Sequence, residues 1–259
     1  MEIRNHRLDL AYIGTRYHGW QEQPGRETIQ GLLNELLTKL YRARVCLAGS
    51  GRTDAGTHAR GQVASFRAEP LLPVDRLPII LNTGLPEDIR VLGARLVPDS
   101  FHAQRSATSK IYLYRIHVGP VIDPFDLPFH HRLSRWPDLD AMAGGARHFL
   151  GTHDFTTFCA HASDEDNHVR TVLDFRLRRR GAKILVQVEA TGFLHHMVRN
   201  MVGTLLEVGK GRRPAGEIQA LLAARDRRLA GPTAPARGLC LMKVFYGARR
   251  KPSLQSPPA

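Results

Sequence analysis

The sequence has 259 residues, of which 42% are hydrophobic and 24% charged, an ordinary composition for a globular protein. No apolar run approaches the ~20 residues that a membrane-spanning helix needs. The N-terminus, MEIRNHRLDLAYIG, lacks the long apolar stretch of a signal peptide. We therefore expect a cytoplasmic globular protein with one large or two small domains and no membrane partner.

The chain is strongly basic. It carries 37 Lys and Arg against 24 Asp and Glu, for a net charge of +13. The stretch after residue 247 holds only three of the basic residues, so the charge belongs to the folded body. Such a body suits a polyanionic partner, usually nucleic acid.

The cysteines and histidines do not have the spacing of a metal site. Three widely separated cysteines form neither a disulfide framework nor a CxxC knuckle, so we expect buried free thiols. The histidine pairs and a Cys-Ala-His triplet also lack paired zinc-site spacing, which predicts that no metal is bound. The residues concerned are Cys46, Cys159, Cys240, His130-His131, His195-His196 and Cys159-Ala160-His161.

The first half of the chain reads as β-α-β-β-α-β. Leu8, Leu10 and Tyr12 alternate along a predicted strand, and Thr28 can cap a helix whose apolar stripe runs from Ile29 to Leu40. The predicted strands are 6–14, 45–49, 62–68 and 89–97, and the second helix is 74–81.

The second half repeats this order. A strand over 106–118 precedes a helix over 139–150, and a hairpin turns near Arg180-Gly181. A helix from about Gly192 to Val208 ends at Gly209, and another begins near Pro214. The other predicted elements are the hairpin strands 169–177 and 183–190, the end of the last helix at about 225, and the strand 239–246.

This pattern predicts an α/β (α+β) fold of two ferredoxin-like, or RRM-like, units with antiparallel sheets. We expect an N-terminal domain over residues 1–104 and a C-terminal domain over 105–247. Residues 248–259, rich in Pro and Ser, are predicted to be a disordered tail.

A glycine-rich segment from Gly49 to Ala59 joins the second and third predicted strands. Three glycines make a tight loop that a ligand backbone can approach closely. Asp54 lies at its centre, and Arg52 could keep that carboxylate ionised. On spacing alone, a turn with an Asx side-chain bond is the favoured interpretation. The segment lacks the spacing of a phosphate-binding P-loop.

Four motifs in register resemble the tRNA pseudouridine synthase A family, from about residue 8 to 247. The loop contains GRTDAGTHA, and the other three motifs are Tyr12–Gln23, Phe101–Tyr114 and Phe193–Gly203. Two positions depart from the family pattern: Thr57, where the family often has valine, and Ile111, where many members are basic.

The resemblance implies an isomerase that converts uridine to pseudouridine in the anticodon stem-loop of tRNA, acting as a homodimer without a cofactor. Asp54 is then the nucleophile that attacks either the sugar C1′ or the base. Arg52 is implied to extrude the target nucleotide, Tyr112 to stack on the flipped base, and Arg199 to pair with Asp54. Further RNA contacts are expected at His58, Arg105, His196 and Asn200.

Tyr112 and Arg199 can also be interpreted without the resemblance. Without the resemblance, Tyr112 could equally be an ordinary strand tyrosine. Arg199 lies in an otherwise apolar helix, and a buried arginine is rare unless it is paired.

Two other classes of protein fit less well. A non-catalytic RNA binder with RRM-like sheets should carry an RNP1 strand, which the sequence lacks, and Asp54 would repel a phosphate backbone. A metal-dependent RNA hydrolase would need clustered carboxylates or histidines that the motifs do not supply.

Overall fold

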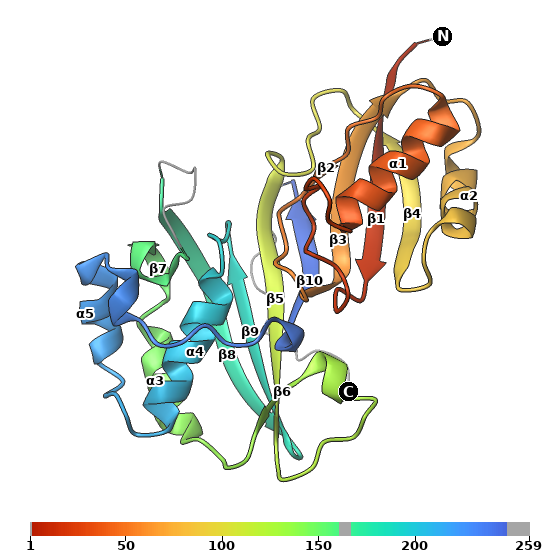
Figure 1. The fold of residues 1–259 in the computed structure, drawn as a ribbon. Coiled ribbons are helices and arrows are strands. Elements are labelled where there is room, and N and C mark those ends of the chain that lie inside the picture. Colours follow the sequence, from red (N-terminus) through yellow and green to blue (C-terminus); the bar gives the residue numbers. More distant parts are fainter. Residues whose placement is uncertain (1, 161–166, 248–259) are drawn as a thin grey trace.

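A computed structural model describes residues 2–160 and 167–247 of the chain. A ten-stranded sheet runs through the molecule, with helices packed against it (Figure 1). The predicted tail at 248–259 and His161 lie outside the described residues. No described helix has both the length and the apolar character that crossing a membrane requires.

The first half forms a ferredoxin-like unit with strand order β4-β1-β3-β2 and antiparallel pairing. Thr28 caps α1 as predicted, since its hydroxyl accepts a hydrogen bond from the Gly31 amide at 3.2 Å. The elements are β1 (Arg4–Tyr12), α1 (Ile29–Tyr41), β2 (Ala48–Gly49), β3 (His58–Ala68), a 3-10 turn (Val74–Arg76), α2 (Leu77–Gly84) and β4 (Ile89–Val97).

The second half repeats the unit with strand order β10-β5-β9-β8. Its elements are β5 (Ala107–Val118), β6 (His131–Leu133), α3 (Leu139–Arg147), β7 (Gly151–Asp154), β8 (Val169–Arg180), β9 (Lys183–Ala190), α4 (Met197–Gly209), α5 (Glu217–Ala224), β10 (Leu239–Tyr246) and 3-10 turns at Leu127–Phe129, Thr156–Phe158, Arg227–Leu229 and Ala236–Gly238. Gly181, at φ +55°, makes the predicted hairpin turn.

Helix α4 begins later than the sequence predicts. It was expected from Gly192, but the helix starts at Met197, after a turn in which the Met197 amide donates to the Leu194 carbonyl. His196 precedes the helix in the left-handed region, at φ 59°. This conformation interrupts the helical geometry, so the two histidines lie outside the helix.

Strand β10 joins the two halves. It pairs in parallel with β3, through Cys240 opposite His58 and Leu241 opposite Ala59, and antiparallel with β5. The predicted fold class is therefore confirmed, with an addition: the two sheets are continuous. The division at residue 104 stays a prediction.

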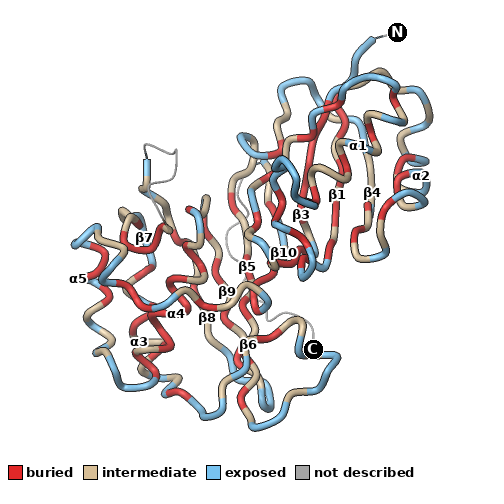
Figure 2. Tube along the Cα trace, in the orientation of Figure 1, coloured by how far each residue is buried: buried red, intermediate tan, exposed pale blue. Residues whose placement is uncertain are grey.

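The core lies between the sheet and the helices. In the view of Figure 1, α1 lies in front of the strands of the first half and α4 in front of those of the second. Figure 2 shows buried positions along the strands behind these helices. Tyr114 is fully buried and donates its hydroxyl hydrogen to the Pro235 carbonyl at 2.8 Å. Cys159 and Cys240 are buried as expected, whereas Cys46 is exposed, which corrects the prediction for that residue.

Candidate active site

The loop that carries Asp54 is held by the chain segment that follows β1. The Trp20 amide donates to the Thr53 carbonyl at 3.0 Å, and the Tyr12 hydroxyl lies 2.8 Å from that of Thr53. Gly19 has φ +91°, and a Cβ there would lie 2.7 Å from the Thr53 carbonyl oxygen. Glycine is therefore required for this close approach. The motif Tyr12–Gln23 thus supports the loop that carries Asp54.

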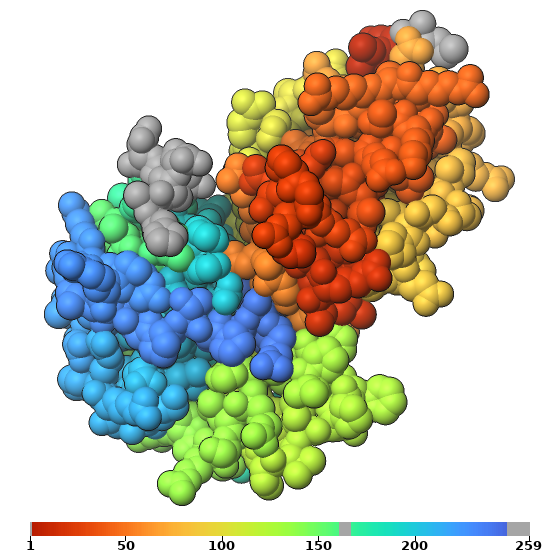
Figure 3. Space-filling view, in the orientation of Figure 1, coloured from red at the N-terminus to blue at the C-terminus, as the bar shows by residue number. Residues whose placement is uncertain are grey.

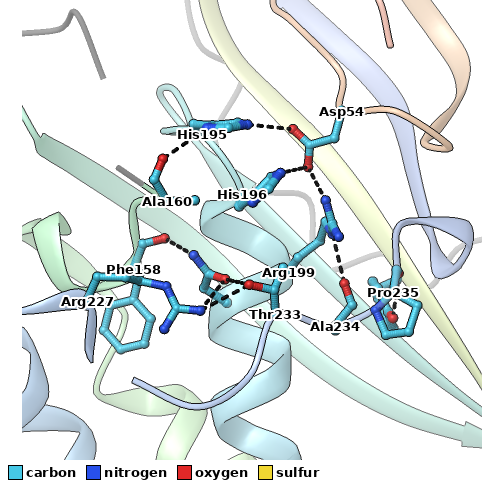
Figure 4. Close-up of polar contacts among 12 residues, drawn as sticks. Asp54, Phe158, Ala160, His195, His196, Arg199, Arg227, Thr233, Ala234 and Pro235 are labelled. Carbon is cyan, nitrogen blue, oxygen red and sulfur yellow. Dashed lines mark hydrogen bonds and ion pairs between the residues drawn. The ribbon is translucent and has the colours of Figure 1, made fainter. Parts of the chain in front are cut away.

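Helix α4 brings a cation to the carboxylate. Arg199 Nη1 donates to Asp54 Oδ2 at 2.8 Å, across 145 residues of sequence. The same guanidinium donates through Nε to the Ala234 carbonyl at 2.8 Å. The side chains of Arg199 and Asp54 are only 14% and 15% exposed. The ion pair expected between them is present (Figure 4).

A second layer of hydrogen bonds fixes Arg199 in place. Asn200 is fully buried and donates from Nδ2 to the Phe158 carbonyl at 2.8 Å. Its Oδ1 accepts bonds from Arg227 and Thr233, at 3.1 and 2.7 Å. These contacts tie the segment before β10 to α4, so that the Ala234 carbonyl faces Arg199. Asn200 was predicted to contact RNA, but its hydrogen bonds favour a supporting role.

Two adjacent histidines also face Asp54. His196 Nε2 lies 3.5 Å from Oδ2, and His195 Nε2 lies 3.8 Å from Oδ1. Burial lowers the pKa of His196 to about 4, against the opposing attraction of Asp54. His196 is therefore neutral at pH 7. His195 was not predicted at this site. Its position next to His196 and four residues before Arg199 is the signal that could have placed it there.

These three side chains could hold a metal ion. Asp54, His195 and His196 bring one potential ligand atom each to within 4.8 Å of one another. The prediction of no metal site was based on the spacing of histidines and cysteines along the sequence. The fold brings this group together from two distant segments of the chain.

Tyr112 lies on β5 beside the carboxylate. It is 7% exposed and meets the Phe193 ring edge-on, with centroids 5.0 Å apart. Burial raises the pKa of its phenol well above the usual value, and the charges of Tyr12 and Asp54 raise it further. Tyr112 therefore offers an uncharged ring at the edge of the site.

The remaining predicted residues differ in their exposure. Arg52 and Arg105 are exposed on loops, where they are accessible to RNA. His58 is 3% exposed, accepts the Gly14 amide at Nδ1, and contacts the Pro128 and Arg237 carbonyls through Nε2. Both ring nitrogens are engaged inside the protein, so the geometry of His58 favours a structural role over RNA contact.

A cavity of about 1040 Å³ lies elsewhere in the structure, and Asp54 does not line it. Leu113 and Arg115 of β5 line it, whereas Tyr112 and Tyr114 point to the opposite side of the strand. It therefore opens on the other face of the sheet. Figure 3 shows the two halves as two lobes, and Asp54 and Arg199 come from different lobes.

Comparisons with known proteins agree with this geometry. A family model described as tRNA pseudouridine synthase matches residues 10–104 and 146–247. A tRNA pseudouridine synthase A of Shouchella clausii is 44% identical, covering 92% of this chain and 92% of the relative. One from Moorella thermoacetica is 45% identical, covering 93% and 98%.

Among solved structures, one chain of a Cbf5-Nop10-Gar1 complex aligns with this chain at a TM-score of 0.36 and 10% identity. The alignment covers 92% of this chain and 58% of the matched chain. The family model covers both sides of the site, including the Asp54 loop and the Arg199 helix. The chain belongs to the tRNA pseudouridine synthase family.

Proposed function

We propose that the chain converts uridine to pseudouridine in the anticodon stem-loop of tRNA, with Asp54 as the nucleophile. The observation that carries the proposal is the ion pair of Asp54 with Arg199 at 2.8 Å, beside the Tyr112 ring. The guanidinium holds this mostly buried carboxylate through Oδ2, so that the other oxygen can act as the nucleophile.

The reaction rearranges bonds within one nucleotide. The C1′–N1 glycosidic bond breaks, the base turns, and a C1′–C5 bond forms. C5 then loses its hydrogen as a proton, and N1 gains one, so substrate and product are isomers. This balance requires no redox partner and no net water. Asp54 stabilises the detached fragment by bonding covalently to it, at C1′ or at the base.

Surrounding residues take separate roles in this proposal. Arg52, exposed on the loop of Asp54, holds the phosphate of the extruded nucleotide. Tyr112 stacks on the flipped base, which suits an uncharged aromatic ring. Arg199 keeps Asp54 ionised and therefore acts as a positioning residue. Arg105 and His196 contact RNA at the border of the site.

The partner is tRNA, bound largely by charge. The net charge of +13 supports recognition of a folded RNA backbone. The ferredoxin-like domains 1–104 and 105–247 contribute Asp54 and Arg199 respectively. Resemblance to the family supports a homodimer whose two chains share one tRNA.

The test is tritium release from tRNA labelled at uracil C5, with the wild type and Asp54→Asn. C5 loses its hydrogen only if the base is reattached through carbon. We expect release to stop in Asp54→Asn while tRNA binding persists. Residual turnover above about one hundredth of wild type would exclude Asp54 as nucleophile, because losing a nucleophile costs more than one acid–base contribution.

A further inference from the structure

Two histidines direct the same ring nitrogen toward one carboxylate. His195 and His196 precede α4, and their Nε2 atoms lie 3.8 and 3.5 Å from the two oxygens of Asp54 (Figure 4). Their ring centroids are 3.9 Å apart. Three atoms of the types that bind zinc therefore lie within 4.8 Å of one another.

The hydrogen bonding of His195 fixes which nitrogen is free. Its Nδ1 lies 3.0 Å from the Ala160 carbonyl oxygen, which can only accept, so Nδ1 carries a hydrogen. Nε2 is then the ring nitrogen that faces Asp54 Oδ1. Histidines that bind metals have this arrangement, donating their other ring N–H to a carbonyl or carboxylate.

The distances suit a small ion. Zinc binds nitrogen and oxygen at about 2.0–2.2 Å, so tetrahedral ligand atoms lie about 3.4 Å apart. The Nε2–oxygen separations of 3.5 and 3.8 Å are close to this value, and all three candidate ligand atoms lie within 4.8 Å of one another. Closing the group on one ion therefore takes side-chain shifts of up to about 1 Å. The His195 side chain is 50% exposed, so an ion can enter from solvent. Arg199 donates to Asp54 Oδ2, the oxygen that His196 also faces, whereas His195 faces Oδ1. Sharing one ion through Oδ1 therefore requires His196 to turn toward that oxygen.

From this geometry we propose that Asp54, His195 and His196 form a binding site for one Zn²⁺ ion that reversibly inhibits the enzyme. Two imidazoles and one carboxylate favour zinc over magnesium, which prefers oxygen ligands. The inhibitory part rests on the proposed function, because the ion takes the lone pair with which Asp54 attacks. The metal is thus an inhibitor, and turnover does not require it.

Direct titration tests the site without RNA, which binds metal ions itself. The full chain competes for Zn²⁺ with a colorimetric chelator, as wild type and as His195→Ala, His196→Asn and Asp54→Asn. Asparagine tolerates the left-handed backbone of residue 196. His148→Ala, at the end of α3 and outside the group, is the matched control.

We expect one Zn²⁺ per wild-type chain. Each variant of the three ligands should bind at least about tenfold more weakly, the loss that even an outer partner of a ligand causes. His148→Ala should bind like wild type. Tritium release by the wild type should fall over the zinc range that saturates the site, return on chelation, and be unaffected by an equal concentration of added Mg²⁺.

Three results would overturn the proposal: no saturable 1:1 binding, unchanged binding in the three ligand variants, or an occupied site with unchanged tritium release. Failure of the proposed function is distinguishable from these. It would appear as persistent turnover in Asp54→Asn, measured without zinc, while the titration still reports on binding.

Discussion

Replacing Arg199 by leucine should remove the ion pair that joins α4 to the loop of Asp54. The change removes a guanidinium that is 14% exposed from a carboxylate that is 15% exposed. Removing one partner of a buried pair costs about 3–5 kcal/mol. We expect the lower end, because His196 remains 3.5 Å from Asp54 and some solvent reaches it.

The Ala234 carbonyl also loses its bond from Arg199 Nε, which adds about 1 kcal/mol. The free energy of unfolding should therefore fall by about 4 kcal/mol. For a chain of this size that lowers Tm by roughly 8–16 °C.

Turnover of Arg199→Leu should fall at neutral pH and recover in part as the pH rises. Without its cation, the charged form of Asp54 is less favoured, and alkaline conditions restore it. Affinity for tRNA should change by less than about tenfold, since about 1.4 kcal/mol corresponds to that factor. Arg199→Lys keeps the charge but cannot reach Asp54 and Ala234 together, so its effects should be intermediate.

The assays are single-turnover tritium release from pH 6 to 9, tRNA binding, and thermal unfolding. A double-mutant cycle with Asp54→Asn isolates the pair, and we expect a coupling of about 3 kcal/mol, the upper part of the usual range. The reasoning is refuted if the two substitutions are additive in stability. It is also refuted if Arg199→Leu weakens tRNA binding severely yet keeps wild-type chemistry, which would make Arg199 a phosphate contact.

Three further predictions concern other features. Burial lowers the pKa of His58, so its contribution to stability is present above pH 6.5 and is lost as the pH falls below that value. Urea unfolding at pH 7 and pH 5 should show a smaller loss of stability in His58→Gln, and an unchanged loss would contradict this. Binding of tRNA should weaken steeply with salt, by a slope of about −0.7 to −0.9 per phosphate contacted, and a flat response would argue against electrostatic recognition. Turnover should survive exhaustive EDTA treatment once magnesium is returned for tRNA folding. A loss that zinc restores would show that a metal is required.

The sequence predicted the elements well because their signals are local. Alternating apolar residues marked β1, and the hydroxyl of Thr28 marked the start of α1. An arginine inside an apolar helix also predicted a carboxylate partner, because a buried guanidinium needs one, and the family resemblance identified that partner as Asp54. That pairing of Arg199 with Asp54 is present in the structure.

Other features depend on contacts that spacing does not encode. His195 and His196 reach Asp54 because a left-handed residue delays the start of α4, whereas the apolar periodicity suggested helix from Gly192 onward. His58 lies in the family motif, and only the fold reveals that the carbonyls of Pro128 and Arg237 meet its ring. The insertion of β10 between β3 and β5 is likewise a long-range pairing.

The position of β10 has a consequence for synthesis on the ribosome. This strand, Leu239–Tyr246, is the last of the described strands to emerge, yet it lies near the centre of the sheet. Until it arrives, the start of β3 at His58–Ala59 and the backbone of β5 from Ala107 to Tyr114 lack a partner strand on one side, the kind of edge that recruits other chains. A message truncated before codon 239 therefore yields a chain whose sheet is open at both of these strands. Such chains should aggregate during translation, so the final strand completes the sheet and protects its interior edges at the same time.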